Sequence, residues 1–138
     1  MPRYQILIDE SFRRPVDEVF ARLSDHNQMG KLFGAPVKRI KDGQGDLNGV
    51  GSVRHIGPPG PLGVQETVTA FEPSQRIEYR VTKGGAPMKN HQGRMLFNAT
   101  PQGSRLQWQI DYDMPPIIGG IVTKVLKSAL SKGVRSLA

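Results

Sequence analysis

The sequence contains no cysteine among its 138 residues. It can therefore form no disulfide, offers no thiol for catalysis and cannot build a zinc site from thiolates. A chain without cysteine fits a reducing compartment, so we expect a cytoplasmic protein.

Long hydrophobic runs are missing as well. No stretch of 18 apolar residues occurs, so we expect no helix that inserts into a membrane. The first five residues lack the basic and apolar regions of a secretory signal peptide. The length predicts one domain over residues 1–138 that is large enough to bury a hydrophobic core.

Acidic residues are scarce: 12 Asp and Glu stand against 19 Lys and Arg, which gives a net charge of +7. A basic balance raises nucleic acids and anionic membranes as partners. The cations near the end of the chain, Lys124, Lys127, Lys132 and Arg135, alternate with apolar residues as on a solvated helix face. Because no nucleic-acid-binding motif is present, we expect no nucleic-acid partner.

Motifs for metals and cofactors are also absent. The three histidines, His26, His55 and His91, have none of the short spacings of metal ligands, so we expect no metal site. The sequence has no P-loop, no dinucleotide-binding glycine loop and no nucleophile elbow. We therefore expect no cofactor, and the sequence leaves open whether the protein is an enzyme.

The last 24 residues have the strongest helical pattern in the chain. Apolar residues recur about four apart and form a broad stripe, which predicts a helix over Pro116–Leu137. Pro115 and Pro116 suit its first turn, where no backbone N–H is required. Gly119 and Gly120 follow, and they fit either a gate that loosens to admit a ligand or close packing of the helix on a sheet.

The rest of the chain is typical of strands joined by Gly/Pro turns. The expected strands are Arg3–Arg13, Val37–Lys41, Gly51–Ile56, Leu62–Phe71, Arg76–Thr82, Lys89–Ala99 and Ser104–Asp113. Two short helices, one beginning at Pro15 and one over Gln28–Phe33, follow the first strand. This order predicts an α+β fold in which a seven-stranded antiparallel sheet wraps around the long C-terminal helix.

Several segments resemble the START/Bet v 1-like superfamily, also called SRPBCC. Residues 11–25 are similar to its opening strand and "Ala-Pro-x-x-Val-Trp" helix, with Arg14 in place of Ala and Phe20 as the aromatic residue. Further similar segments are Gly49–Val53, Glu66–Pro73 with Arg76–Val81, and Gly103–Trp108. The resemblance covers nearly the whole chain and is strongest to the bacterial polyketide cyclase/dehydrase-like branch.

The resemblance implies a helix-grip fold with a cavity under the last helix that binds hydrophobic molecules. Members of the superfamily include carriers, sensors, aromatase/cyclases and hydrolase-like enzymes. It has no shared catalytic motif to transfer to this chain, so it implies a pocket and not a reaction.

Strand alternation, together with Phe20 on the first short helix, predicts which side chains line the cavity. The expected lining is Ile8, Phe20, Val53, Val68, Tyr79, Met95, Trp108 and Ile110, with Glu66 and His91 as its polar members. His55 and Glu10 share the inward parity on the same reasoning. These polar groups would do acid/base chemistry, orient a ligand, or simply satisfy one another, and a β-bulge would shift the parity.

Three functions follow from this interpretation. The first is a carrier or sensor that binds a hydrophobic or amphipathic small molecule, including a lipid, between sheet and helix. The second is a cyclase/dehydratase-like enzyme that acts on a bound carbonyl compound. The third is a membrane- or protein-docking domain that uses the basic face of the last helix. Self-association into a homodimer stays open.

Overall fold

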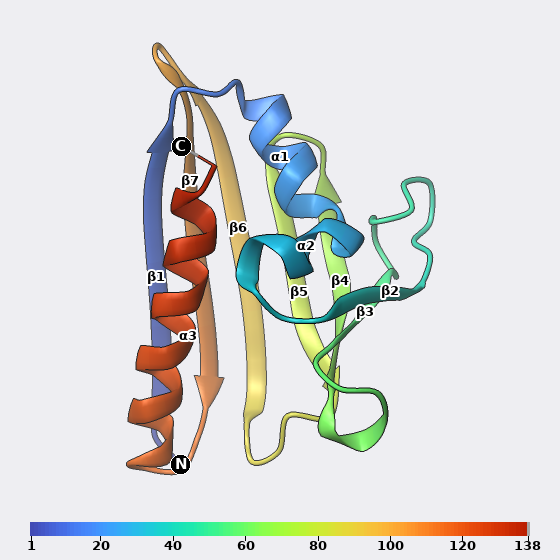
Figure 1. The fold of residues 1–138 in the computed structure, drawn as a ribbon, viewed down its shortest axis with the longest axis vertical. Helices are drawn as coiled ribbons and strands as arrows, with labels where there is room; N and C mark the ends of the chain where they lie inside the picture. The colour runs from blue at the N-terminus through green and yellow to red at the C-terminus, as the bar shows by residue number, and fades with distance from the viewer. Residues whose placement is uncertain (138) are drawn as a thin grey trace.

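The computed structural model describes residues 1–137 and contains a seven-stranded antiparallel sheet with a long C-terminal helix (Figure 1). The strands are β1 (Arg3–Phe12), β2 (Val37–Lys41), β3 (Val53–Ile56), β4 (Val64–Glu72), β5 (Arg76–Lys83), β6 (Lys89–Thr100) and β7 (Gly103–Asp113). The helices are α1 (Val16–Ser24), α2 (His26–Phe33), the short 3₁₀ helix η1 (Gly60–Leu62) and α3 (Ile118–Arg135). The predicted α+β helix-grip fold is confirmed.

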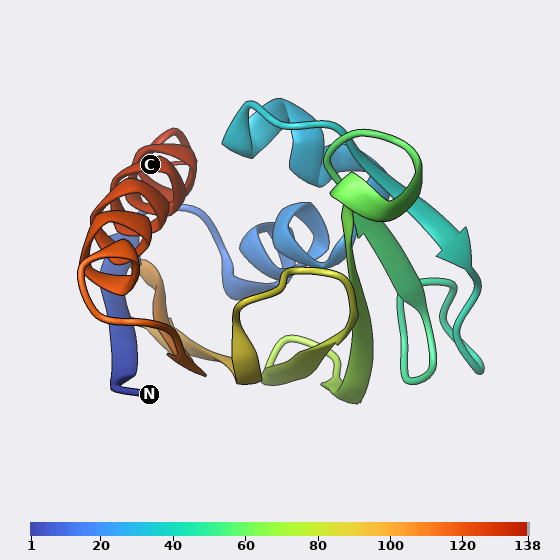
Figure 2. The ribbon, with the colours of Figure 1, turned by 90° about the horizontal axis from the view of Figure 1, so that it is seen from below.

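The strands lie in the order β1-β7-β6-β5-β4-β3-β2, and every neighbouring pair is antiparallel. β1 therefore joins β7 at one end of the sheet, while the other strands follow as consecutive hairpins. Seen from below, the sheet curves strongly, with α3 along one margin and α2 and β2 along the other (Figure 2). The concave face between these margins is where an interior space can form.

One part of the core packs beneath α1 on this concave face. Phe20 of α1 packs edge-on against Phe71 and Phe97, with ring centroids 5.3 and 5.0 Å apart. A register shift between Val68 and Ala70 inserts one extra residue into β4 and returns Phe71 to the inner face. This bulge changes the alternation of β4 partway along the strand.

Helix α3 differs from its prediction in two respects. It begins at Ile118 and not at Pro116, because Ile117 adopts φ +72°, a conformation that β-branched residues rarely take. Its apolar stripe is only half buried: Leu126, Leu130 and Val134 pack inward, while Ile121 and Val125 are exposed. The open side of the stripe therefore has no partner among the described residues.

The two glycines at the start of α3 have different surroundings. A Cβ atom on Gly119 would lie 2.2 Å from the ring of Tyr4, so this glycine permits close packing of the helix on β1. A Cβ atom on Gly120 would meet nothing within 4 Å. Close packing accounts for Gly119 and leaves Gly120 without a packing role.

Candidate functional site

A cavity of about 270 Å³ lies between the concave sheet and helices α2 and α3. Its wall is mostly apolar, with Met29 and Phe33 from α2, Ile110 from β7, and Leu126 and Leu130 from α3 among its lining. Apolar cavities with a few polar groups are the usual form of small-molecule sites. The polar groups of this cavity come from the strands opposite α3.

The structure places the predicted lining residues in two groups. Five of them lie in the cavity wall: Glu66, Tyr79, His91, Trp108 and Ile110. The other five do not: Ile8, Phe20, Val68 and Met95 are buried in the packed core, and Val53 is half-buried on the opposite face of β3. Strand alternation does not distinguish the filled part of the inner face from the hollow part.

Arg54 is the charged residue of the cavity wall that the sequence analysis missed. It is 3% exposed, and its Nε donates to Glu66 Oε1 at 2.7 Å, with Nη2 also 2.7 Å from that oxygen. In the β3–β4 pairing Arg54 stands directly opposite Glu66. Antiparallel partners share a face, so the inward direction of Glu66, combined with this hairpin register, was the signal that could have identified Arg54.

The remaining nitrogen of Arg54 faces α2. Its Nη1 donates to Met29 Sδ at 2.9 Å and lies 3.4 Å from His26 Nδ1. The guanidinium also lies over the ring of Tyr79, 4.6 Å from its centroid, in a cation–π contact. The nitrogen atoms of Arg54 in the cavity wall are thus all engaged by protein groups.

His26 continues this polar network away from the cavity. Its ring is 1% exposed, and Nε2 lies 2.9 Å from Ser52 Oγ. Burial, reinforced by the positive charges of Arg54 and Arg39, lowers the pKa of His26 to about 3. The neutral ring therefore accepts from Arg54 at Nδ1 and donates to Ser52 at Nε2.

His91 is also neutral at ordinary pH. Burial lowers its pKa, although the nearby Glu66 carboxylate acts in the opposite direction. The backbone N–H of Val81 donates to His91 Nδ1 at 3.1 Å, so the neutral ring carries its hydrogen on Nε2. That Nε2 lies 3.7 Å from Glu66 Oε2, which is too far for a hydrogen bond.

Tyr79 and Trp108 form a second polar pair. The indole Nε1 of Trp108 donates to the Tyr79 hydroxyl at 2.9 Å. Burial raises the pKa of Tyr79, and the Glu66 carboxylate adds to the effect, so the phenol stays protonated. One end of the cavity thus offers a carboxylate oxygen, an imidazole N–H and a phenol O–H.

The two other polar residues that strand alternation predicts to face inward, His55 and Glu10, do not lie in the cavity wall. His55 faces the outer side of β3, where its Nε2 donates to the Pro58 carbonyl at 2.7 Å. Glu10 accepts from Arg135 of α3 at 3.0 Å. The inward prediction for His55 is wrong because the parity of β3 is the reverse of the one assumed.

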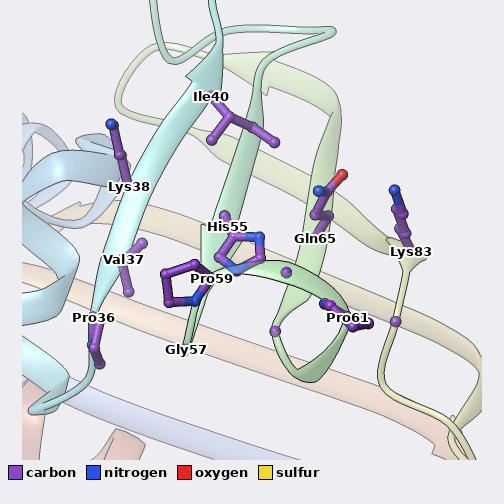
Figure 3. A pocket seen from close by; sticks show the side chains of 13 residues that line it. Pro36, Val37, Lys38, Ile40, His55, Gly57, Pro59, Pro61, Gln65 and Lys83 are labelled. Atoms are coloured by element: carbon purple, nitrogen blue, oxygen red, sulfur yellow. The ribbon is translucent and has the colours of Figure 1, made fainter.

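A larger depression of about 800 Å³ lies on the outside of the sheet (Figure 3). Pro36, Ile40, Pro59 and Pro61 contribute to its wall, with His55 at its centre. We place the candidate site in the smaller inner cavity because the outer groove is open and its histidine is already engaged with the loop. The inner cavity, in contrast to the outer groove, is lined by several converging buried polar groups.

Two further properties of the described residues bear on function. Within residues 1–137, no group of three or more His, Asp or Glu residues is placed to hold a metal ion. In the same part of the chain, no helix is long and apolar enough to cross a membrane.

Comparison with known proteins agrees with the fold. The model of the family described as "Polyketide cyclase / dehydrase and lipid transport" matches residues 8–138. None of the curated proteins matches the chain significantly. Similar solved structures include a Thalictrum flavum norcoclaurine synthase in complex with dopamine and hydroxybenzaldehyde, with a TM-score of 0.71, 16% identity, and coverage of 99% of this chain and 86% of that one.

Two other solved structures cover almost the full length of both chains. A protein of Nitrosospira multiformis has a TM-score of 0.70 and 17% identity, over 99% of this chain and 97% of its own. Ara h 8.0201 has a TM-score of 0.68 and 12% identity, over 99% and 98% respectively. At such identities the likeness establishes the fold alone.

Proposed function

The chain belongs to the polyketide cyclase/dehydrase and lipid-transport family, and we propose that it binds a small hydrophobic or amphipathic molecule in the cavity under α3. On this proposal the protein acts as a carrier or a sensor. The single observation that supports it is the combination of an apolar wall with one polar end, at Glu66, Tyr79 and His91.

The size of the cavity limits the ligand. At about 270 Å³ it lies just below the range of about 300–1,000 Å³ that is usual for small-molecule sites. A molecule of one or two rings, or a short branched chain, fits this space. The solved relative with dopamine and hydroxybenzaldehyde holds molecules of this size, which supports the proposal by analogy.

The proposal is tested by obstructing the cavity. Ala129 is an exposed residue of α3 at the edge of the cavity lining, so the larger side chain of Ala129→Phe should cover the opening and reduce ligand binding. Ala21→Phe, on the exposed side of α1, is the matched control. We would measure native mass spectra for co-purified ligand and the quenching of Trp108 fluorescence during ligand titration; equal binding by both variants would contradict the proposal.

An acid/base enzyme is a second candidate. It is favoured by the 3.7 Å separation of His91 Nε2 and Glu66 Oε2, with the protonated Tyr79 hydroxyl in the same wall. Such a set could exchange a proton next to the carbonyl of a bound ketone. The protein should accelerate deuterium uptake at that carbon of an aryl ketone, as followed by NMR, and His91→Phe should lose this acceleration. If the wild-type protein does not accelerate the uptake, the enzyme candidate is rejected and the binding function remains.

Docking to an anionic membrane surface is a third candidate. Four apolar residues at the start of α3 and along its outer side are exposed: Ile117, which precedes the helix, by 81%, Ile118 by 51%, Ile121 by 60% and Val125 by 62%. Leu62 of η1 is 83% exposed, and η1 and the start of α3 lie at the same end of the molecule (Figures 1 and 2). An exposed apolar surface of this kind marks interaction sites.

The charge of α3 selects the partner for this third candidate. Lys124, Lys127 and Lys132 flank this exposed apolar surface, and α3 contains no acidic residue. Juxtaposed lysines and aliphatic residues suit a bilayer that contains anionic lipids.

A flotation assay tests the docking candidate. The protein should bind vesicles that contain phosphatidylglycerol and not vesicles of phosphatidylcholine alone. Ile121→Asp should weaken this binding, whereas Leu47→Asp, at a residue 52% exposed in the β2–β3 connection, should not. A change of oligomeric state in Ile121→Asp, with no vesicle binding by the wild type, would instead indicate a homodimer.

A further inference from the structure

The polar end of the cavity has one acceptor without a protein partner. Glu66 Oε1 receives both contacts from Arg54, at 2.7 Å each. The other oxygen, Oε2, has His91 Nε2 at 3.7 Å and no hydrogen-bond partner among residues 1–137. Glu66 is 9% exposed and lies in the cavity wall, so the space that Oε2 faces is the cavity itself.

The guanidinium of the neighbouring Arg54 has no nitrogen left to bind a ligand. The Nε and Nη2 atoms of Arg54 face Glu66, and Nη1 faces Met29 and His26. A ligand carboxylate would therefore meet the free oxygen of Glu66 without a matching arginine fork, and two carboxylates at close range repel. The cavity should reject anions for this reason.

A cationic group is unfavourable for a different reason. Arg54 already neutralises Glu66, so a second buried positive charge would have no uncompensated partner. A neutral group that donates a hydrogen bond meets neither penalty. It satisfies Glu66 Oε2, a charged acceptor whose hydrogen bonds are stronger than those of neutral groups.

The same end also supplies hydrogen-bond donors. Tyr79 accepts from Trp108, which leaves its own hydrogen free to donate, and His91 carries a hydrogen on Nε2. A ligand group that both donates and accepts can therefore use both kinds of partner. A hydroxyl group has this property, whereas an ether or ester oxygen accepts only.

We infer that the ligand is a neutral molecule with a small apolar body and one hydroxyl group, which donates to Glu66 Oε2 and accepts from Tyr79 or His91. This inference rests on the proposed binding function and names the ligand class for the same cavity. The cavity should therefore bind hydroxyl compounds more tightly than carboxylates of similar size or ligands that only accept hydrogen bonds.

The test compares three probes with the same apolar body: 4-propylphenol, 4-propylanisole and 4-propylbenzoate. Isothermal titration calorimetry near neutral pH measures their affinities for the full chain. A hydrogen bond to a charged acceptor predicts that the phenol binds about tenfold or more tightly than the anisole. The benzoate, an anion under these conditions, should bind more weakly than the phenol by at least the same factor.

A paired variant assigns the preference to Glu66. Because Glu66→Gln leaves Arg54 without its counter-charge and endangers folding, the variant replaces both partners, as Arg54→Met/Glu66→Leu. The matched control makes the same exchanges in the exposed pair on the outer face, as Arg105→Met/Asp9→Leu. The first variant should bind phenol and anisole about equally, while the control should retain the wild-type preference.

Each outcome has a distinct meaning. Equal or tighter binding of the anisole or the benzoate by the wild type overturns the hydroxyl inference and leaves the binding function in place. Retention of the phenol preference in Arg54→Met/Glu66→Leu also overturns it. Failure of all three probes to bind overturns the proposed function for ligands of this size, and the inference with it.

Discussion

Loss of Arg54 should destabilise the protein more than almost any other single polar substitution. The side chains of Arg54 and Glu66 are 4% and 11% exposed, so the pair is removed from water. Arg54→Met leaves the buried Glu66 carboxylate without its counter-charge and takes away the donor to His26. We expect a loss of about 3–5 kcal/mol in the free energy of unfolding, which lowers Tm by roughly 10–20 °C.

The double variant Arg54→Met/Glu66→Leu should recover most of this loss. Removing both charges abolishes the uncompensated carboxylate, and replacing a buried ion pair with apolar groups of similar volume is often neutral or stabilising. The two substitutions should therefore be strongly non-additive, with the double variant within about 2 kcal/mol of the wild type. Urea denaturation followed by Trp108 fluorescence measures all of these values.

An exposed pair provides the control. Arg105 and Asp9 form a similarly short ion pair on the outer face, but their side chains are 44% and 52% exposed. Arg105→Met should change the free energy of unfolding by less than about 1 kcal/mol. An equally small effect for Arg54→Met would show that water reaches the Arg54–Glu66 pair and that the pair is not a buried one.

Three further perturbations test other parts of the structure. The pKa of His26 is lowered to about 3, so its ring stays neutral in the folded state while the unfolded chain takes up a proton below about pH 6.5. The free energy of unfolding should therefore fall by about 1 kcal/mol for each pH unit of acidification between these values. Urea titrations at several pH values should show a weaker dependence of this free energy on pH in His26→Gln. Gly120→Ala should stabilise α3 by about 0.5–1 kcal/mol, whereas Gly119→Ala should not, because a Cβ atom at Gly119 collides with Tyr4. A higher melting temperature for Gly119→Ala than for Gly120→Ala would contradict the close packing of Gly119 against Tyr4. Tyr79→Phe should lower the free energy of unfolding by about 1–3 kcal/mol, because the buried Trp108 Nε1 loses its acceptor, and calorimetry that shows no loss would argue against this bond.

The fold was predictable because its signals are local. Strand β7 alternates strictly between apolar and polar residues, and its buried positions, such as Leu106, Trp108 and Ile110, match that pattern. The apolar spacing of α3 and the Gly/Pro turns between strands supplied the remaining element order. The START/Bet v 1-like resemblance agreed with the same order, so both lines led to one architecture.

The site was less predictable because it depends on pairing between strands. Val53 and Arg54 are neighbours on β3, and choosing which of them faces inward requires the register with β4. The bulge between Val68 and Ala70 reverses the alternation within one strand, which no periodic pattern reveals. Whether an inward residue meets the core or the cavity depends on how far α3 stands from the sheet, and this is set by tertiary packing.

The exposed half of the α3 stripe illustrates the same limit. Ile121 and Val125 have the spacing of core residues, and helical periodicity predicts their burial together with Leu126 and Leu130. The curved sheet supplies a surface for only one side of that stripe. The width of an apolar stripe therefore predicts an amphipathic helix without predicting how much of it is covered.

An NMR titration of the ¹⁵N-labelled protein with 4-propylphenol tests most directly whether the cavity under α3 is the binding site. Trp108 is the only tryptophan, so its indole N–H gives a single resonance from the cavity wall. We expect saturable shifts of this resonance and of the amides of Gly85 and Leu126, which line the same space. Saturable shifts confined to the outer groove, at His55 and Gly57, would contradict it.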